Sequence, residues 1–540
     1  MCAEIGRPQA AVRSGRRLSA RGGRPRWRQV KVDLDGLREV LAPAEVLRFR
    51  NEPIHGLADH GADVEPGDVF FAVPGTTVDG SRFATEAVGR GAVAVVADRP
   101  LPVVVPCWIV DDVRRAAGRV AAEFFRHPSR RMAVLGITGT NGKTTVSDLL
   151  RLCLEDDEHA VGSLGTISYN LGPSNGGDGK VDAVVPARTT TPGPIEMQRY
   201  LRCMADRGVG AVVLEASSHA LDQGRTDAVE FDAAVFTNLT RDHLDYHGSM
   251  QAYAASKERL FGQLRPGALA VLPADDPTAV SMREAVPPGV RIATWELAGG
   301  KRALPAGDVH VIGRVVRGDL CATRLEIRTP EGSVDIALPL VGEHNARNAL
   351  AAVACAVGLG IGSLRVADAL TRARPVRGRL EPVNDHGRGI HLFVDYAHTP
   401  DALKKVLMSL RPLTGGRLRV LFGCGGERDE GKRPSMGRIA AQLADHVVVT
   451  HDNPRREDPE RILQQIVAGA VEAEPSRAVV DVCADRRAAI GHILTRAGRG
   501  DTVVLAGKGH ELGQTIGGRV LPFDDREEAE LWLAGAGTER

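Results

Sequence analysis

The sequence predicts an α/β protein of three domains, and three observations lead to this prediction. The chain has 540 residues, and a typical domain has about 100–200 residues. Its composition, 43% hydrophobic and 25% charged, is that of globular proteins rather than disordered or fibrous chains. Short apolar segments typical of buried strands alternate with helical segments, which is the pattern of a parallel sheet. We therefore expect a small N-terminal domain, a central domain with a parallel sheet and a C-terminal doubly wound, Rossmann-like domain.

Charge, aromatic content and cysteine spacing exclude several classes of protein. A net charge of +1 and an aromatic content of 4% argue against a nucleic-acid-binding protein. No apolar run approaches the roughly 18–20 residues that span a bilayer. The eight cysteines include no Cys-x-x-Cys pair, which argues against structural zinc and fits a reducing compartment. We expect a cytoplasmic monomer that binds neither nucleic acid nor membranes.

The segment 1–31 differs from the rest of the chain. It is rich in arginine, and residues 5–31 contain no acidic side chain. It lacks the apolar stretch of a secretory signal, whereas its composition is compatible with an organellar transit peptide, a disordered tail or a start codon assigned too early. We favour a disordered extension, because arginine is preferred to lysine throughout the chain.

The first domain is predicted over residues 32–131. A strand that ends in a turn is expected at 68–75, and short strands are expected at 92–97 and 103–105. The spacing of apolar residues predicts a helix over 113–125.

The central domain is predicted over residues 132–374. A strand at 132–138 leads into a glycine-rich segment at 139–145, and a helix follows to about Leu154. Two further strands and a second helix are expected at 211–215, at 233–237 and from about Met250.

The third domain is predicted over residues 375–540. It contains four buried strands, each followed by a polar loop and a helical stretch; they are expected at 391–395, 418–422, 446–450 and 502–506. This doubly wound pattern places ligands at the carboxyl ends of the strands.

The glycine-rich segment Gly139-Thr140-Asn141-Gly142-Lys143-Thr144-Thr145 has the features of a phosphate-binding loop. Its glycines let backbone N–H groups approach phosphate oxygens, and the helix N-terminus adds a favourable dipole. Lys143 can reach the terminal phosphates, and Thr144 can bind Mg²⁺. The strict P-loop pattern is not met, because Ile137 stands at its first glycine. An ordinary glycine-rich turn is the alternative interpretation.

Residues Thr138–Thr145 closely resemble the ATP loop of the Mur ligase and folylpolyglutamate synthase superfamily, whose members use ATP to join an amine to a carboxylate. The resemblance implies a UDP-substrate-binding first domain, an ATP-binding central domain and an amino-acid-binding third domain. It implies ATP and Mg²⁺ as cofactors. It also implies further nucleotide contacts from residues in later motifs, namely Asn345, Arg379, Asp395 and His398.

Three residues are candidates for the metal and for carboxylate activation. Glu215 follows a predicted strand, and Mg²⁺ prefers carboxylate oxygens. The resemblance implies that Glu215 and His243 bind a second metal ion, and that Lys257 reacts with CO₂ to form a carbamate that can face Mg²⁺. Taken alone, Glu215 could cap a helix, His243 could be a hydrogen-bonded loop residue and Lys257 could be a solvated helix lysine. Lys143, Glu215, His243 and Lys257 are the predicted catalytic residues, and Thr144 completes the predicted metal set.

Motifs at the strand ends of the third domain resemble the diaminopimelate-adding group of the Mur ligases. The residues concerned are Arg428, the tetrapeptide Asp452-Asn453-Pro454-Arg455, Gly507 and Glu511. The chemistry agrees with meso-diaminopimelate, because Arg455 and Arg428 can pair with its distal carboxylate and Glu511 with the ammonium. A plain Asn-Pro-Arg turn is the alternative.

The donor implied by the resemblance is UDP-N-acetylmuramoyl-L-alanyl-D-glutamate. Its predicted contacts are Thr76, Thr77, Val78, Thr190, Thr191, Ser217, Gln223, Arg225 and Lys257. The first domain departs from the family at His60-Gly61-Ala62, where a serine and an arginine are usual, and Gly193 stands where an acidic residue is common. The UDP end is therefore predicted less directly than the nucleotide and amino-acid ends.

The sequence supports the hypothesis of an ATP-dependent amide ligase of cell-wall precursor synthesis that acts through an acyl phosphate. The altered segment at residues 60–62 keeps open a paralogous ligase that uses another carboxylate donor or amine in a secondary pathway. A non-catalytic, nucleotide-responsive binding protein is a more distant alternative. It would be favoured by loss of Lys143, Glu215 or His243, and all three residues are present.

Overall fold

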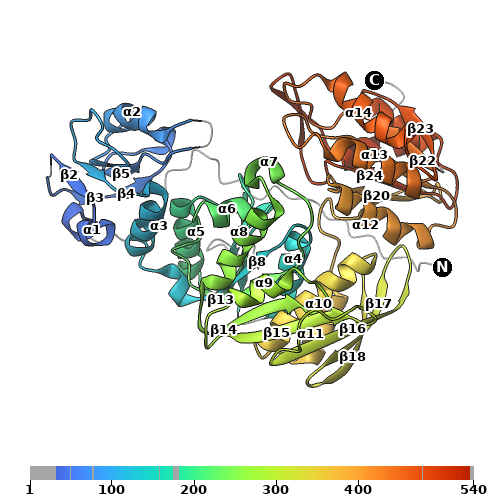
Figure 1. The fold of residues 1–540 in the computed structure, drawn as a ribbon, viewed down its shortest axis with the longest axis horizontal. Helices are drawn as coiled ribbons and strands as arrows, with labels where there is room; N and C mark the ends of the chain where they lie inside the picture. Colours follow the sequence, from blue (N-terminus) through green and yellow to red (C-terminus); the bar gives the residue numbers. More distant parts are fainter. Residues whose placement is uncertain are drawn as a thin grey trace.

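The computed structural model describes residues 32–48, 50–75, 78–156, 159–173, 182–476 and 478–535. The predictions for segment 1–31 and for Thr76 and Thr77 lie outside these residues. Figure 1 shows three α/β units, with the N-terminal and C-terminal units standing on either side of the central one. Each unit contains one large sheet, and the exact boundaries between the predicted domains stay a prediction.

The N-terminal unit is built on a five-stranded sheet. In spatial order its strands are β2 (Glu45–Leu47), β7 (Cys107–Ile109), β6 (Ala94–Ala97), β5 (Asp68–Phe71) and β4 (Gly56–Ala58). The sheet is parallel except for β2. Its helices are α1 (Leu34–Leu41), α2 (Ala84–Gly89) and α3 (Val113–Phe124), and β1 (Val32–Asp33) pairs separately with β3 (Pro53–Ile54). The predicted helix at 113–125 is confirmed.

The strand predicted at 103–105 is wrong. Those residues lie outside the sheet, Val104 is 79% exposed, and the strand is β7 instead. Two prolines, Pro102 and Pro106, flank the valines. A proline has no N–H to donate to a strand ladder, so the apolar run between the two does not pair.

The central unit contains an eleven-stranded sheet that is parallel in its middle and antiparallel at both edges. Its spatial order is β11 (Asp182–Pro186), β10 (Ser168–Pro173), β9 (Val161–Leu164), β12 (Ala211–Glu215), β8 (Ala133–Thr138), β13 (Phe231–Phe236), β14 (Leu264–Pro273), β15 (Arg291–Leu297), β16 (Val309–Gly318), β17 (Thr323–Thr329) and β18 (Gly332–Leu338). The sequence predicted the parallel middle of this sheet, but not the antiparallel strands at its two edges.

Helices cover both faces of this central sheet. One face packs against α4 (Lys143–Leu154), α10 (Glu343–Gly358) and α11 (Ser363–Thr371). The other packs against α5 (Pro194–Asp206), α8 (Met250–Gly262) and α9 (Ala279–Glu284). The short helices α6 (Ser218–Asp222) and α7 (Leu244–His247) follow β12 and β13. The predicted strands of this unit and the predicted helices at 143–154 and from Met250 are confirmed.

The C-terminal unit has a six-stranded sheet. Its spatial order is β19 (Glu381–Val383), β20 (His391–Asp395), β24 (Thr502–Ala506), β21 (Leu418–Phe422), β22 (His446–Val449) and β23 (Val479–Val482). All strands except β19 are parallel. One face packs against α12 (Pro400–Leu410), α13 (Lys432–Leu443) and α14 (Pro459–Val471), and the other against α15 (Arg486–Thr495) and α16 (Asp525–Leu533). A hairpin of β25 (Gly513–Ile516) and β26 (Arg519–Pro522) precedes α16.

The strand ends of the central and C-terminal units lie next to one another. Asn141, after β8, donates a hydrogen bond of 3.2 Å to Asp401 on α12. Arg241, after β13, forms an ion pair of 3.5 Å with Asp429, after β21. A cavity of about 400 Å³ lies between the two units and is lined by residues of both. None of the helices in the described part of the chain has the length and apolarity needed to cross a membrane.

Candidate active site

The phosphate loop is packed tightly against its neighbours between β8 and α4. Gly139 and Gly142 have φ values of +147° and +88°, a region that side chains rarely adopt. A Cβ on Gly139 would lie 1.9 Å from the Thr237 hydroxyl oxygen, and one on Gly142 would lie 2.3 Å from the Asn348 amide oxygen. Both positions therefore require glycine for conformation and for space.

Hydrogen bonds from the end of β13 hold the loop backbone in place. Thr237 Oγ1 donates to the Asn141 carbonyl oxygen at 2.6 Å, and the Asn141 N–H donates to Asn238 Oδ1 at 3.1 Å. The Thr140 N–H donates to the Asn238 carbonyl oxygen at 2.9 Å. The loop is thus fixed by neighbouring residues of the protein itself.

Lys143 lies over this loop at the start of α4. Its Nζ donates hydrogen bonds to the carbonyl oxygens of Gly139, at 2.8 Å, and Thr140, at 3.0 Å. Burial lowers the pKa of the Lys143 ammonium. The cation is therefore held at the loop by backbone oxygens, at the place where the sequence predicts phosphate contacts.

Glu215 ends β12 and collects three hydrogen bonds. Thr144 Oγ1 donates to Glu215 Oε2 at 3.0 Å, and Thr166 donates through its hydroxyl at 2.9 Å and through its N–H at 3.0 Å. The carboxyl is 1% exposed. Sequence reasoning missed Thr166, whose signal is its place just after the buried strand β9. The structure thus brings two predicted metal residues, Thr144 and Glu215, into contact.

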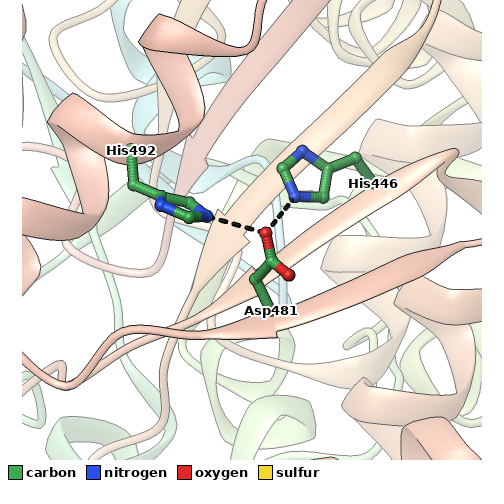
Figure 2. A group of neighbouring side chains, drawn as sticks. All are labelled: His446, Asp481 and His492. Carbon is green, nitrogen blue, oxygen red and sulfur yellow. Dashed lines mark hydrogen bonds and ion pairs between the residues drawn. The ribbon is translucent and has the colours of Figure 1, made fainter.

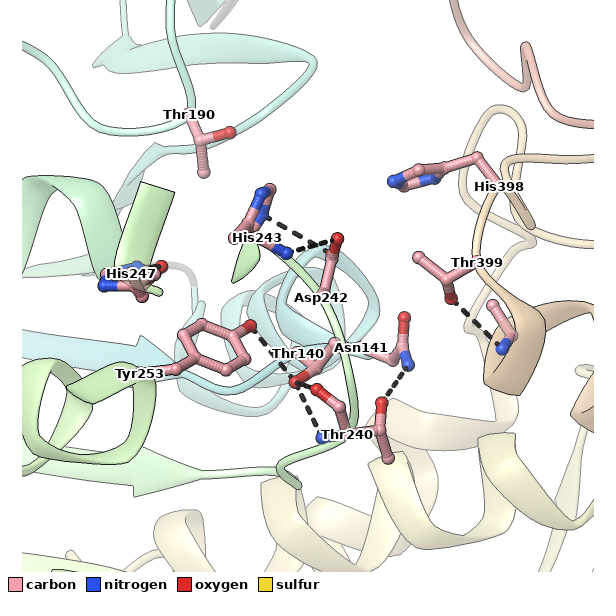
Figure 3. A network of polar contacts seen from close by, with 12 residues as sticks. Thr140, Asn141, Thr190, Thr240, Asp242, His243, His247, Tyr253, His398 and Thr399 are labelled. Atoms are coloured by element: carbon pink, nitrogen blue, oxygen red, sulfur yellow. Dashed lines mark hydrogen bonds and ion pairs between the residues drawn. The ribbon is translucent and has the colours of Figure 1, made fainter. Parts of the chain in front are cut away.

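His243 and Lys257 both lie near Tyr253, whose ring Figure 3 shows beside His243. Burial lowers the pKa of His243 to about 4, so the ring is neutral at pH 7, the form that binds metals. Lys257 is 1% exposed on α8, and its Nζ lies 4.3 Å from the centre of the Tyr253 ring. Among the described residues it forms no ion pair. Burial, and next the charge of Lys143, lower the pKa of Lys257 well below its usual value.

The cavity between the two units contains most of the predicted nucleotide contacts. Of these, Asn141, Gly142, Thr145, Asn345, Arg379, Asp395 and His398 line it, whereas Gly139, Thr140, Lys143 and Thr144 do not. Asp395 accepts the N–H groups of Leu380 and Ala397, both at 2.7 Å, and the Arg379 guanidinium lies 4.7 Å from the Tyr396 ring centre. Figure 3 shows His398 and Thr399 on the C-terminal side of the cleft, facing Asp242 and His243 on the central side. Thr399 caps the N-terminus of α12, because its Oγ1 accepts the N–H of Ala402 at 3.3 Å.

The predicted amino-acid site is held together by contacts between its own charged residues. Glu511 Oε2 accepts from Asn453 Nδ2 at 2.7 Å and from Lys508 Nζ at 3.1 Å. Lys508 is fully buried and also lies 3.7 Å from Asp452 Oδ1. Sequence reasoning missed Lys508, whose signal was its place between Gly507 and Glu511. Burial raises the pKa of Asp452.

Two arginines predicted for this site differ in their surroundings. Arg455 has φ +56° and donates through Nη1 to the Gly426 carbonyl oxygen at 2.6 Å. The Arg428 side chain is exposed on the loop after β21. To pair with Arg455, a ligand carboxylate would therefore have to replace the hydrogen bond between the guanidinium and the Gly426 carbonyl oxygen.

The predicted donor residues of the central unit lie in two segments, one before α5 and one after β12, and the second contacts the N-terminal unit. Thr191 Oγ1 donates to Ser217 Oγ at 3.1 Å, and Arg225 Nη1 donates to the Thr191 carbonyl oxygen at 3.0 Å. Arg225 also donates to Gln223 Oε1 through Nε at 3.0 Å and Nη2 at 2.7 Å. Thr190 lies 3.3 Å from Thr166, between hydroxyl oxygens. Val78 is exposed in the N-terminal unit.

A further group of potential metal ligands lies away from the cleft, on β22, β23 and α15 (Figure 2). His446 Nε2 and His492 Nε2 lie 3.0 and 2.7 Å from Asp481 Oδ2. Arg419 and Arg496 each donate to the Nδ1 atom of one histidine. A guanidinium cannot accept a hydrogen bond, so each Nε2 carries the proton and donates to Asp481. The contacts thus form a hydrogen-bonded structural cluster without a free metal-binding nitrogen.

Comparison with known proteins assigns most of the chain to one family. The profile described as Mur ligase middle domain matches residues 137–356, that described as Mur ligase, glutamate ligase domain, matches 378–509, and that described as Mur ligase family, catalytic domain, matches 53–131. The UDP-N-acetylmuramoyl-L-alanyl-D-glutamate–2,6-diaminopimelate ligase of Synechococcus elongatus is 41% identical over 521 residues, covering 92% of this chain and 99% of the relative.

The chain belongs to the Mur ligase family.

Solved structures agree with this assignment. A UDP-N-acetylmuramoyl-L-alanyl-D-glutamate–2,6-diaminopimelate ligase structure matches with a TM-score of 0.61 and 30% identity, covering 94% of this chain and 99% of that one. The MurF ligase of Thermotoga maritima in complex with ADP shares the fold, with a TM-score of 0.59 and 20% identity over 90% of this chain and 98% of that one. The predicted fold class and the prediction of an ATP-using C–N ligase of the Mur family are confirmed.

Proposed function

We propose that the protein adds meso-diaminopimelate to UDP-N-acetylmuramoyl-L-alanyl-D-glutamate, in the cytoplasm, with ATP and Mg²⁺. The observation that carries this proposal is that the strand ends of the central unit lie next to those of the C-terminal unit. The central unit contributes a phosphate loop with Lys143 and Glu215, and the C-terminal unit contributes Asn453, Arg455 and Glu511. Relatives about 40% identical over nine-tenths of the chain are named as ligases of these two substrates.

The residues around Glu215 suit Mg²⁺. Thr144 and Glu215 offer oxygen atoms that lie in contact, and neutral His243 adds a nitrogen. We propose that Lys257 completes the set as a carbamate. Burial, and the absence of an ion pair with any residue that the structure describes, favour its neutral amine, which is the form that reacts with CO₂. When bound, Mg²⁺ supplies positive charge that stabilises a transferring phosphoryl group.

The chain's own residues then account for the transfer of the phosphoryl group. ATP would occupy the cavity between the units, with its phosphates at the loop, where Lys143 can leave the carbonyl oxygens of Gly139 and Thr140 for phosphate oxygens. The γ-phosphoryl group passes to the D-glutamate carboxylate, which gives an acyl phosphate and ADP. The amine of the acceptor attacks the acyl carbon, and phosphate leaves.

The acceptor is positioned by the C-terminal unit. Arg455 and Arg428 pair with its distal carboxylate, and Glu511 receives the ammonium. Within the described part of the chain, Lys508 and Asn453 contact only Oε2 of Glu511, so Oε1 stays available for the ligand. A lysine acceptor lacks the distal carboxylate and would leave Arg455 on the Gly426 carbonyl oxygen.

One feature keeps a paralogous ligase with another donor as the second candidate. Gly61, in the segment that departs from the family, starts a short 3-10 turn, and a Cβ there would lie 3.0 Å from Phe83 Cβ. This packing leaves little room for a larger side chain at that position. The UDP end must therefore be bound by other residues if the donor is the muramoyl dipeptide.

The deciding experiment measures ADP release by the purified protein with ATP and Mg²⁺. The donors are the UDP-muramoyl dipeptide and simpler carboxylates, and the acceptors are meso-diaminopimelate and lysine. We expect turnover with the UDP-muramoyl dipeptide and meso-diaminopimelate only. Turnover with a simpler donor would favour the paralogous ligase instead.

A further inference from the structure

Two arginines from different units converge on one neutral acceptor. Arg114, on α3 of the N-terminal unit, donates to Gln223 Oε1 at 3.0 Å. Arg225, in the central unit, donates to the same oxygen through two nitrogens. The two guanidinium groups must therefore lie within a few ångströms of one another, although like charges repel.

Neither Arg114 nor Arg225 forms an ion pair with a carboxylate within the described part of the chain. Asp59 is close enough to act on Arg225 electrostatically, but burial raises its own pKa and it pairs with neither arginine. Burial, and next the charge of Arg114, lower the pKa of Arg225. The two guanidiniums are thus held together at an electrostatic cost that an anion between them would remove.

The position of the pair indicates what this anion belongs to. Arg114 Nη2 also donates to the Pro74 carbonyl oxygen at 2.7 Å, in the loop that leads to Val78. Arg225 Nη1 donates to the Thr191 carbonyl oxygen at 3.0 Å. The pair therefore spans the N-terminal loop and the central segment that are both predicted to contact the donor.

We propose that Arg114 and Arg225 together bind an anionic group of the donor across the junction of the N-terminal and central units. This inference rests on the proposed function and adds Arg114 to its donor site. The chemistry recognised is that of phosphate or carboxylate oxygens, which guanidinium groups bind in paired hydrogen bonds. In the donor these oxygens belong either to the diphosphate or to the D-glutamyl residue.

The test compares binding of UDP and of the full UDP-muramoyl dipeptide by calorimetry, without ATP. The variants are Arg114→Gln and Arg114→Lys. The matched control is Arg115→Gln, because Arg115 is the next residue of α3 and pairs across the same junction with Asp227 at 3.0 Å. Thermal unfolding of each variant shows whether it is folded.

We expect Arg114→Gln to weaken donor binding about ten- to a hundredfold, as for loss of a charge-assisted hydrogen bond. Arg114→Lys should recover part of the loss, and Arg115→Gln should leave binding unchanged. Equal weakening for UDP alone assigns the diphosphate, whereas weakening confined to the full donor assigns the glutamyl carboxylates. Both results support the proposal.

Two results would overturn it. Unchanged donor binding by folded Arg114→Gln would show that Arg114 does not contact the donor. Equal weakening by Arg114→Gln and Arg115→Gln would show that α3 only tethers the two units. If the wild-type protein itself bound neither UDP nor the full donor, the proposed function would fail together with this inference, and that outcome is distinguishable because it appears before any substitution.

Discussion

The phosphate loop and the amino-acid site are built in opposite ways. The loop is a single stretch of seven residues whose backbone is fixed by hydrogen bonds from Thr237 and Asn238 and is packed against Asn348. The amino-acid site is assembled from three strand-end loops, and its charged groups hold one another. Glu511 contacts Lys508 and Asn453, and Arg455 contacts a backbone oxygen.

This difference bears on how each site binds its ligand. A preformed backbone loop loses little freedom when phosphate arrives, so its binding energy is available for positioning and charge stabilisation. At the amino-acid site a ligand must replace internal contacts with equivalent ones. An amino acid is then selected as acceptor when its own charged groups replace the contacts that the site residues lose on binding.

The largest effect is expected at the loop. Lys143→Ala removes a cation that would face the transferring phosphoryl group, so kcat should fall at least about 10²–10³-fold. The unfolding temperature should stay near that of the wild type, because the side chain contacts loop carbonyls and not the apolar core. Lys404→Ala, an exposed lysine on α12, is the control. Near-normal turnover by folded Lys143→Ala would remove the loop from the mechanism.

The next effect tests the buried lysine beside the loop. Lys257→Ala should lower kcat about 10–100-fold, which is typical of loss of a group that orders a metal site. Acetate or another small carboxylate should restore part of the activity, because it returns a negative charge to the position of the carbamate. Activity is measured with and without acetate, and Lys143→Ala under the same conditions should show no recovery.

The activity of Lys257→Arg tests the proposal that Lys257 carries a carbamate. A guanidinium does not form a carbamate with CO₂, so this variant should stay inactive at any bicarbonate concentration. Wild-type activity in Lys257→Arg would show that positive charge alone suffices at this position.

The contrast between the two sites also explains what the sequence could predict. The loop could be predicted from the sequence because its residues are contiguous and lie between a recognisable strand and a recognisable helix. The strands that position it were predicted at almost their observed bounds. The strand at 103–105 failed because an apolar run carries no information on pairing when prolines flank it. The antiparallel edges of the central sheet were missed because their strands carry none of the predicted site residues, which were the guide to the other strands.

At the sites, the sequence predicted the residues that belong to recognisable motifs, but not the residues elsewhere that hold them in place through hydrogen bonds. Thr166, Lys508 and Arg114 act through contacts that join segments 49, 3 and 109 positions apart. Lys508 lies between two predicted residues, Gly507 and Glu511, yet only its burial beside the carboxylates of Asp452 and Glu511 shows that it anchors Glu511. Arg114 lies on a helix of another domain, and no spacing along the chain connects it with Gln223.

The amino-acid site should show a smaller and more selective effect than the loop. Arg455→Ala removes a charge-assisted pair of about 1.5–3 kcal/mol, so kcat/KM for meso-diaminopimelate should fall about one to two orders of magnitude. Use of lysine should change much less, and the KM for ATP should hardly move. Steady-state kinetics with both acceptors measure the ratio. An equal loss for the two acceptors would show that the Arg455 side chain only holds its loop in shape through the Gly426 carbonyl oxygen.

The smallest effect is expected where the two sites meet. Arg241 lies in the loop that carries His243, Asp429 lies in the loop that carries Arg428, and their ion pair is 3.5 Å long with Arg241 59% exposed. Exposed pairs contribute about 0.2–1 kcal/mol, so Asp429→Asn should change kcat/KM for the acceptor no more than about fivefold. Added salt should reduce the difference between the variant and the wild type, because it screens an exposed pair.

The double variant Arg241→Gln with Asp429→Asn should be no worse than either single one if the residues act as a pair. Additive losses would mean that each residue acts separately, and the loop and the amino-acid site would then be coupled by other contacts, such as that of Asn141 with Asp401.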